Sequence, residues 1–174
     1  MKFELLASTV IHKGHAIILR VDDLRTPDGR EVKYDIVEHH GSVIIVPVDE
    51  NGNIYFVRQY RHAAGLDMLE LPAGTLEPDE LPAVCAAREI REETGMQAAN
   101  IKEIGSFYLA PGYSTELMHV FLATGLSHNP LEADADEFLS VEILPFSDAL
   151  KLAANGELAD AKSLAALLLA QANL

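Results

Sequence analysis

Apolar and polar residues alternate along the first part of the chain in a pattern typical of β-strands. Three stretches, 3–12, 15–24 and 30–39, are rich in apolar and β-branched residues. A Lys-Gly pair separates the first two, and the turn-forming sequence TPDG separates the second from the third. The pattern predicts an antiparallel β-meander at the N-terminus.

Two more strands are predicted within 41–62, on either side of the sequence DENGN. The Asn-Gly pair in it is a strong signal for a β-hairpin. The segment that follows, 68–80, contains two Pro and one Gly, which predicts a strand that ends in a loop.

The loop leads into an acidic helix, predicted over 81–94. Asp79 or Glu80 can cap the helix, and Pro82 suits its first turn. Gly95 fits the left-handed position just past the end of the helix.

Two faces of this helix differ in character. Val84, Ala87 and Ile90 recur at three-residue intervals and form an apolar face. Glu89 and Glu93 project from adjacent turns of another face. The helix is therefore predicted to be amphipathic, with an acidic side.

The rest of the chain predicts three strands and two helices. The strands fall at 101–110, 117–126 and 138–146, and the helices at 147–156 and 159–174. Because strands outnumber helices, we expect an α+β fold in which helices pack against a mixed sheet.

Length and charge limit the classes of protein. A chain of 174 residues is the size of one domain, so we expect a single domain over 1–174. The formal net charge of −14 would repel a phosphate backbone, so no nucleic-acid partner is expected. No apolar run is long enough for a bilayer span, and the N-terminus does not resemble a signal peptide. We therefore expect a cytoplasmic protein with no membrane partner.

Cysteine chemistry is limited to one residue. Cys85 is the only cysteine, which excludes an internal disulfide and a multi-thiolate metal site. Its apolar neighbours indicate a small buried residue, in preference to a reactive thiol.

Charged residues and glycines recur at fixed spacing around the acidic helix. In order they are Gly74, five residues, Glu80, seven residues, and then Arg88-Glu89-Ile90, any residue, Glu92-Glu93, any residue and Gly95-Met96. This spacing matches every fixed position of the Nudix box. The chain therefore resembles the Nudix hydrolases.

The residues alone leave two readings of the acidic helix open. Like charges at these spacings repel by a few tenths of a kcal/mol per exposed pair, and a bound hard cation such as Mg²⁺ would offset that repulsion. Arg88 could instead balance the charge of a solvated helix that binds no metal. The complete box favours the metal.

The resemblance implies a Nudix fold, an α/β/α sandwich, and a bound divalent metal, Mg²⁺ or Mn²⁺. By that resemblance Glu89 and Glu93 are the principal metal ligands. Glu92 is a further ligand or a supporting catalytic group, and the backbone carbonyl of Ala73 is an additional candidate ligand. Arg88 would hold a carboxylate in place.

Segments outside the box resemble the ADP-ribose pyrophosphatase group of Nudix enzymes. They are VRQYRHA at 57–63, LELPAG at 69–74 and LAPGYSTELMHVFLA at 109–123. Pro111 lies sixteen residues beyond Gly95, near the place where that group carries a marker proline. The resemblance implies hydrolysis of the pyrophosphate bond of ADP-ribose or of a related nucleoside diphosphate sugar.

Four charged residues are candidates for substrate contact. Arg58 and Arg61 lie three apart on a strand and should point to opposite faces. By resemblance we favour Arg61 for the diphosphate, with a surface salt bridge as the alternative. Glu70 is a candidate for a substrate hydrogen bond or for a pair with an arginine. Glu116 is a candidate ligand or substrate contact.

The general base is predicted in the acidic segment 131–145, because the ADP-ribose group has a glutamate on a loop well after the box. We favour Glu137, which directly precedes a strand, over Glu132, Asp134 and Asp136. The same resemblance implies a homodimer in which residues 1–40 contribute to the interface.

Two further functions remain open at this stage. A Nudix domain can bind a nucleotide as a non-catalytic sensor, but a sensor does not need the full set of carboxylates. A pyrophosphohydrolase of noncanonical nucleoside triphosphates would use the same helix without the flanking segments.

Overall fold

A computed structural model describes residues 2–132 and 138–174 of the chain. The chain divides into two compact units. The first contains the residues up to Gly41 together with Phe107–Met118, and the second contains Ser42–Ser106 and His119–Leu174.

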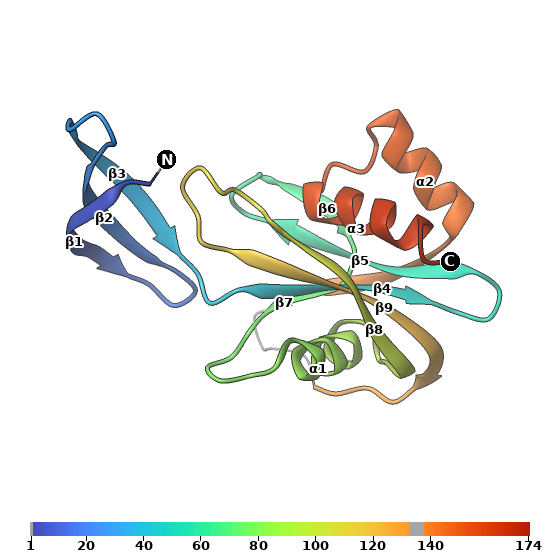
Figure 1. The fold of residues 1–174 in the computed structure, drawn as a ribbon. Coiled ribbons are helices and arrows are strands. Elements are labelled where there is room, and N and C mark those ends of the chain that lie inside the picture. Colours follow the sequence, from blue (N-terminus) through green and yellow to red (C-terminus); the bar gives the residue numbers. More distant parts are fainter. Residues whose placement is uncertain (1, 133–137) are drawn as a thin grey trace. The chain divides into compact units, whose positions relative to one another are not determined.

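The first unit is built on the predicted meander. Strands β1 (Glu4–Lys13), β2 (Ile18–Arg25) and β3 (Glu31–Glu38) form an antiparallel sheet in the order β1-β2-β3 (Figure 1). Segment 107–118 joins this unit through backbone hydrogen bonds, because the Val37 N–H donates to the Tyr113 carbonyl at 2.7 Å and the Thr115 N–H donates to the Val37 carbonyl at 3.0 Å.

The second unit contains a seven-stranded sheet in the order β10-β5-β4-β9-β8, with β6 paired to β5 and β7 paired to β4. Its strands are β4 (Ser42–Val48), β5 (Asn53–Arg61), β6 (Leu66–Glu70), β7 (Ala73–Thr75), β8 (Met96–Tyr108), β9 (Leu117–His128) and β10 (Leu139–Pro145).

Helices cover both faces of this sheet. Helix α1 (Pro82–Thr94) lies on one face, and α2 (Phe146–Asn155) and α3 (Ala161–Gln171) lie on the other (Figure 1). The predicted fold class, α+β with an α/β/α sandwich, is confirmed. Among the described residues no helix is both long and apolar enough to cross a membrane.

The core lies on either side of β4. All seven residues of β4 are buried, which explains why this strand reads as an unbroken apolar run without alternation. On the α1 face, Val43 and Ile45 pack with Ile90 of the helix and Phe121 of β9. The acidic helix is thus anchored to the centre of the sheet.

The expected N-cap of α1 is wrong. Its N-cap is Leu81, and no side chain caps it. Glu80 does not cap because its carboxylate is already engaged, accepting from the Glu77 N–H and from Arg88. At the other end Gly95 adopts the predicted left-handed conformation, with φ of 71°.

The buried face of α1 also differs from the prediction. Val84, expected in the apolar face, is 55% exposed. The buried residues are Cys85, Ala86, Glu89, Ile90, Glu93 and Thr94. The acidic side of the helix therefore faces the protein, where segment 73–75 is the short strand β7 instead of the predicted loop.

Candidate active site

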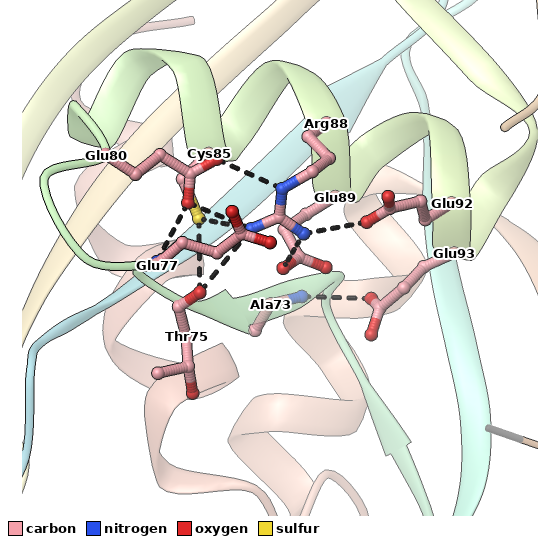
Figure 2. A network of polar contacts seen from close by, with 9 residues as sticks. All are labelled: Ala73, Thr75, Glu77, Glu80, Cys85, Arg88, Glu89, Glu92 and Glu93. Atoms are coloured by element: carbon pink, nitrogen blue, oxygen red, sulfur yellow. Dashed lines mark hydrogen bonds and ion pairs between the residues drawn. The ribbon is translucent and has the colours of Figure 1, made fainter. Parts of the chain in front are cut away.

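The site begins with the short strand that precedes α1. Ala73 and Gly74 of β7 pair with Ile44 and Val43 of β4, and the Ile45 N–H donates to the Pro72 carbonyl at 2.9 Å. The Ala73 N–H donates to Glu93 Oε2 at 3.0 Å (Figure 2). The backbone of β7 is thus fixed to the central strand and faces the acidic side of α1.

Gly74 makes room for a glutamate. A Cβ atom on residue 74 would lie 1.8 Å from Glu89 Oε1 and 1.9 Å from Glu89 Cδ. Such distances are far inside van der Waals contact. The glycine of the box is required here for space, so that the Glu89 carboxylate can lie directly against the β7 backbone.

Arg88 gathers three carboxylates of the box. Its Nε and Nη2 donate to the two oxygens of Glu80, both at 3.0 Å. Its Nη1 donates to Glu89 Oε1 at 2.7 Å and to Glu92 Oε2 at 2.8 Å (Figure 2). The guanidinium is therefore the positive centre of an otherwise acidic cluster.

These contacts change the acidity of both partners. The hydrogen bond from Arg88, with help from the Glu77 N–H, outweighs burial and lowers the pKa of Glu80 from 4.5 to about 2. The hydrogen bond to Glu80, together with Glu89 and Glu92, raises the pKa of Arg88. Both groups are fully charged at neutral pH.

Cys85 has a packing role beneath this cluster. The side chain is fully buried, as predicted, and its Sγ lies 3.3 Å from Arg88 Nη2 and 3.6 Å from the Thr75 carbonyl oxygen. Burial raises the pKa of the thiol, so Cys85 remains protonated and unreactive at neutral pH.

The donor set around β7 and α1 fits a hard divalent cation. Glu89 and Glu93 are only 7% and 3% exposed and flank the β7 backbone, and such cations take carboxylate and carbonyl oxygens. Within 2–132 and 138–174, however, no three side chains of His, Cys, Asp or Glu are arranged around one point that could hold a metal. Glu89 and Glu92 turn toward Arg88, while Glu93 turns toward the Ala73 N–H.

A second charged cluster lies where β5 and β6 meet α3. Glu70 is 1% exposed, and its two oxygens accept from Nε and Nη2 of Arg61 at 2.8 and 2.7 Å. Lys162 of α3 also contacts Glu70 Oε2. Burial alone would raise the pKa of Glu70, but hydrogen bonds and charge from Arg61 and Lys162 lower it overall.

This cluster bears on the alternatives named for Glu70 and Arg61. Glu70 pairs with an arginine, and Arg61 is the arginine that it holds. The Arg61 side chain remains 42% exposed. Arg61 is therefore in a salt bridge, the alternative named for it above, with a buried carboxylate as its partner and its own side chain open to solvent.

Lys162 is not among the residues predicted from the sequence. A signal for it exists, because a lysine in the first turn of a helix faces the positive end of the helix dipole. Such a lysine is unfavourable unless carboxylates compensate, and Asp160 at the N-cap of α3 is 2.9 Å from its Nζ.

Three other predicted site residues, Arg58, Pro111 and Glu116, are described by the structure. Arg58 pairs with Glu142 of β10 and does not join Arg61 in holding Glu70. Pro111, which is exposed, and Glu116, whose backbone N–H donates to Ser114 Oγ at 3.2 Å, belong to the first unit. Glu137 lies outside the described residues.

Fold and site together define an α/β/α protein that carries a carboxylate-rich helix against a glycine-containing strand. A family model described as NUDIX domain matches residues 38–167. The chain belongs to the Nudix family, and the resemblance found in the box is confirmed.

Two relatives indicate the branch of the family, and one solved structure shares the fold. The chain is 41% identical to an ADP-ribose pyrophosphatase of Bacillus subtilis, over 91% of this chain and 86% of that protein. It is 39% identical to an ADP-ribose pyrophosphatase of Mycobacterium tuberculosis, over 95% and 82%. A crystal structure of an ADP compounds hydrolase has the same fold, with a TM-score of 0.87, 23% identity and coverage of 98% and 93%.

The contact between Gly74 and Glu89 predicts the effect of one methyl group. Gly74→Ala should leave the fold intact, because the atoms it meets belong to the end of a flexible side chain. The displaced Glu89 carboxylate should weaken Mn²⁺ binding at least tenfold, which titration calorimetry can measure. Gly112→Ala is the matched control, since nothing lies within 4 Å of a Cβ there. Unchanged Mn²⁺ affinity in Gly74→Ala would contradict this account of the glycine.

The lowered pKa of Glu80 predicts a pH-dependent stability. A carboxyl whose pKa falls on folding stabilises the protein above its unfolded pKa, and that contribution is lost as pH falls through the folded pKa. Wild type should therefore be more stable than Glu80→Gln above pH 4.5, and the difference should vanish as the pH falls toward 2. Urea unfolding of both proteins across this range measures it. A difference that does not vary with pH would show that the ion pair with Arg88 is not its source.

Proposed function

We propose that the protein hydrolyses the pyrophosphate bond of ADP-ribose or a related nucleoside diphosphate sugar, with Mg²⁺ or Mn²⁺ as cofactor. The observation that carries this proposal is the placement of Glu89 and Glu93 against the β7 backbone, with Gly74 leaving room for the first. The two relatives described above are ADP-ribose pyrophosphatases, which supports the choice of substrate.

The metal ligands are assigned to one side of α1. Glu89 and Glu93, with Glu92 and the Ala73 carbonyl in support, would hold the cation. When bound, the cation polarises phosphoryl oxygens and lowers the pKa of a bound water. Arg88 orients Glu89 and Glu92 through its Nη1 atom and prevents these carboxylates from repelling one another.

Substrate binding is assigned to Arg61, with Arg58, Glu70, Pro111 and Glu116 as further candidates. Arg61 suits the diphosphate because a guanidinium offers paired donors to phosphate oxygens. Its Nε and Nη2 already donate to Glu70, which fixes the plane of the guanidinium. Glu70 thus orients Arg61.

The alternatives are separated by one substrate panel. ADP-ribose, GDP-mannose and noncanonical nucleoside triphosphates are incubated with the protein, and the phosphate-containing products are identified. We expect AMP and ribose 5-phosphate from ADP-ribose, only with divalent metal, because the acidic helix cannot approach a diphosphate without cations between them.

Glu93→Gln, which removes a ligand charge at little change in shape, should lower turnover by several orders of magnitude.

Four outcomes would count against the enzyme proposed here. Full turnover in excess EDTA would show that the reaction needs no divalent metal. Full turnover of Glu93→Gln would show that Glu93 is not a metal ligand. Binding of ADP-ribose without hydrolysis would instead identify a sensor. Preferred cleavage of nucleoside triphosphates would identify a pyrophosphohydrolase of noncanonical nucleoside triphosphates.

Glu137 is proposed as the base that accepts a proton from the attacking water. A base must reach that water within about 3 Å, and a glutamate next to a strand can be held there. Glu137→Gln should lower turnover at least ~100-fold while Mn²⁺ binding is retained. Asp136→Asn and Glu132→Gln are the matched variants, and loss of activity in either with full activity in Glu137→Gln would move the role to that residue.

We also propose a homodimer, with residues 1–40 as the dimerisation region of one Nudix domain spanning 1–174. All ten residues of β1 are exposed in the single chain, including Leu5, Val10 and Ile11, each more than half exposed. Exposed apolar residues on a sheet edge favour pairing with another chain. Light scattering should give about twice the chain mass of 19.0 kDa. A monomer mass at micromolar concentration would contradict the proposal.

A further inference from the structure

We propose that the first turn of α3 positions two parts of the active site, which we call its two arms. Ser163 positions the metal-binding strand β7, and Lys162 positions Arg61. This inference rests on the proposed function, because it assigns Arg61 to the diphosphate and β7 to the metal. Neither residue is proposed to touch substrate, so both are positioning residues.

Ser163 links α3 to the segment that leads into β7. Its side chain is fully buried, and its Oγ accepts from the Leu71 N–H at 2.7 Å. The same hydroxyl donates to Asp160 Oδ2 at 2.5 Å, so its hydrogen points away from Leu71 and its lone pair faces the Leu71 amide. Two residues after Leu71 comes Ala73, whose N–H donates to Glu93.

Lys162 links the same turn to Arg61. Its Nζ contacts Glu70 Oε2 and lies 2.9 Å from Asp160 Oδ2, and its side chain is 13% exposed. Glu70 is therefore held between two cations, Lys162 on one side and Arg61 on the other. Because Lys162 shares the charge of Glu70, less of that negative charge acts on the exposed end of Arg61.

Asp160 joins the two links. Its Oδ2 accepts from the backbone N–H of Ser163 at 3.0 Å, from the Ser163 hydroxyl and from Lys162. A buried ionic cluster of this kind is poor evidence for stability, because desolvation of the charges opposes their attraction. The cluster instead fixes the position of α3, because Ser163 is hydrogen-bonded to Leu71 and Lys162 is paired with Glu70.

The Lys162 link predicts a change in substrate binding. Lys162→Met keeps most of the length of the side chain and removes its charge, so the full negative charge of Glu70 would act on Arg61. The Michaelis constant for ADP-ribose should rise about tenfold, the effect of losing one charged hydrogen bond, while turnover at saturation changes little. Lys162→Arg, which keeps the charge, should recover part of this loss.

A double-mutant cycle with Arg61→Ala tests whether Lys162 acts through Arg61. If it does, Lys162→Met should add little to the Michaelis constant once Arg61 is gone. Full additivity of the two changes would overturn this arm of the proposal.

The Ser163 link predicts a change in metal binding. Ser163→Ala leaves the Leu71 N–H without its acceptor and loosens the segment before β7. Mn²⁺ affinity, measured by electron paramagnetic resonance of the free ion, should fall about tenfold, and the Leu71 and Ala73 amides should exchange faster with solvent. Ser163→Thr, which retains the hydroxyl, should restore both. Wild-type affinity and exchange in a folded Ser163→Ala would overturn this arm.

A control separates positioning from a general loss of stability. Leu167→Val lies on the same helix, at an apolar residue that is 1% exposed, and removes no polar group. It should lower the melting temperature and leave the Michaelis constant, Mn²⁺ affinity and both exchange rates unchanged. The same changes in Leu167→Val as in the cluster variants would overturn the proposal.

Failure of the proposed function can be distinguished from failure of the proposal about α3. If wild type cleaves none of the nucleotides, the function is wrong, yet calorimetric ADP-ribose binding by Lys162→Met and amide exchange in Ser163→Ala still decide whether α3 positions the two arms.

Discussion

The arrangement of the site depends on how the protein compensates negative charge on a helix that packs against the core. Glu89 and Glu93 are buried on the side of α1 that faces β7, where an uncompensated carboxylate would be very costly. Arg88 supplies part of the compensation through contacts with Glu80, Glu89 and Glu92, and the Ala73 N–H donates to Glu93. The contacts with Glu89 and Glu92 also orient these two carboxylates, so one guanidinium both balances their charge and sets their orientation.

The second constraint is the close approach of strand and helix. Strand β7 is only three residues long, but its pairing with β4 ties it to the most buried strand of the sheet. With its backbone fixed there, the distance between residue 74 and Glu89 leaves no volume for a side chain. A glycine in this place is a packing requirement of the site, and its conformational freedom is not used.

Much of this could be predicted from local patterns. Most strands, the hairpin at Asn51-Gly52 and the end of α1 at Gly95 depend on neighbouring residues and were predicted within a few positions. Strand β8 begins at Met96 where 101 was predicted, and β7 was predicted as a loop. Errors arose where distant partners intervene. Glu80 does not cap α1 because Arg88 holds it, and Val84 is exposed because the acidic side of the helix faces β7.

By itself the sequence determined the family, the fold class and the set of glutamates, because each depends on spacing along the chain, which folding does not change. Only the tertiary structure decided how those groups are held. Lys162 and Ser163 lie 92 residues from Glu70 and Leu71 in the chain, and no local pattern joins them. These contacts exist because α3 packs on the face of the β4 sheet opposite α1 (Figure 1), where a buried polar group is stable when it has a hydrogen-bond partner.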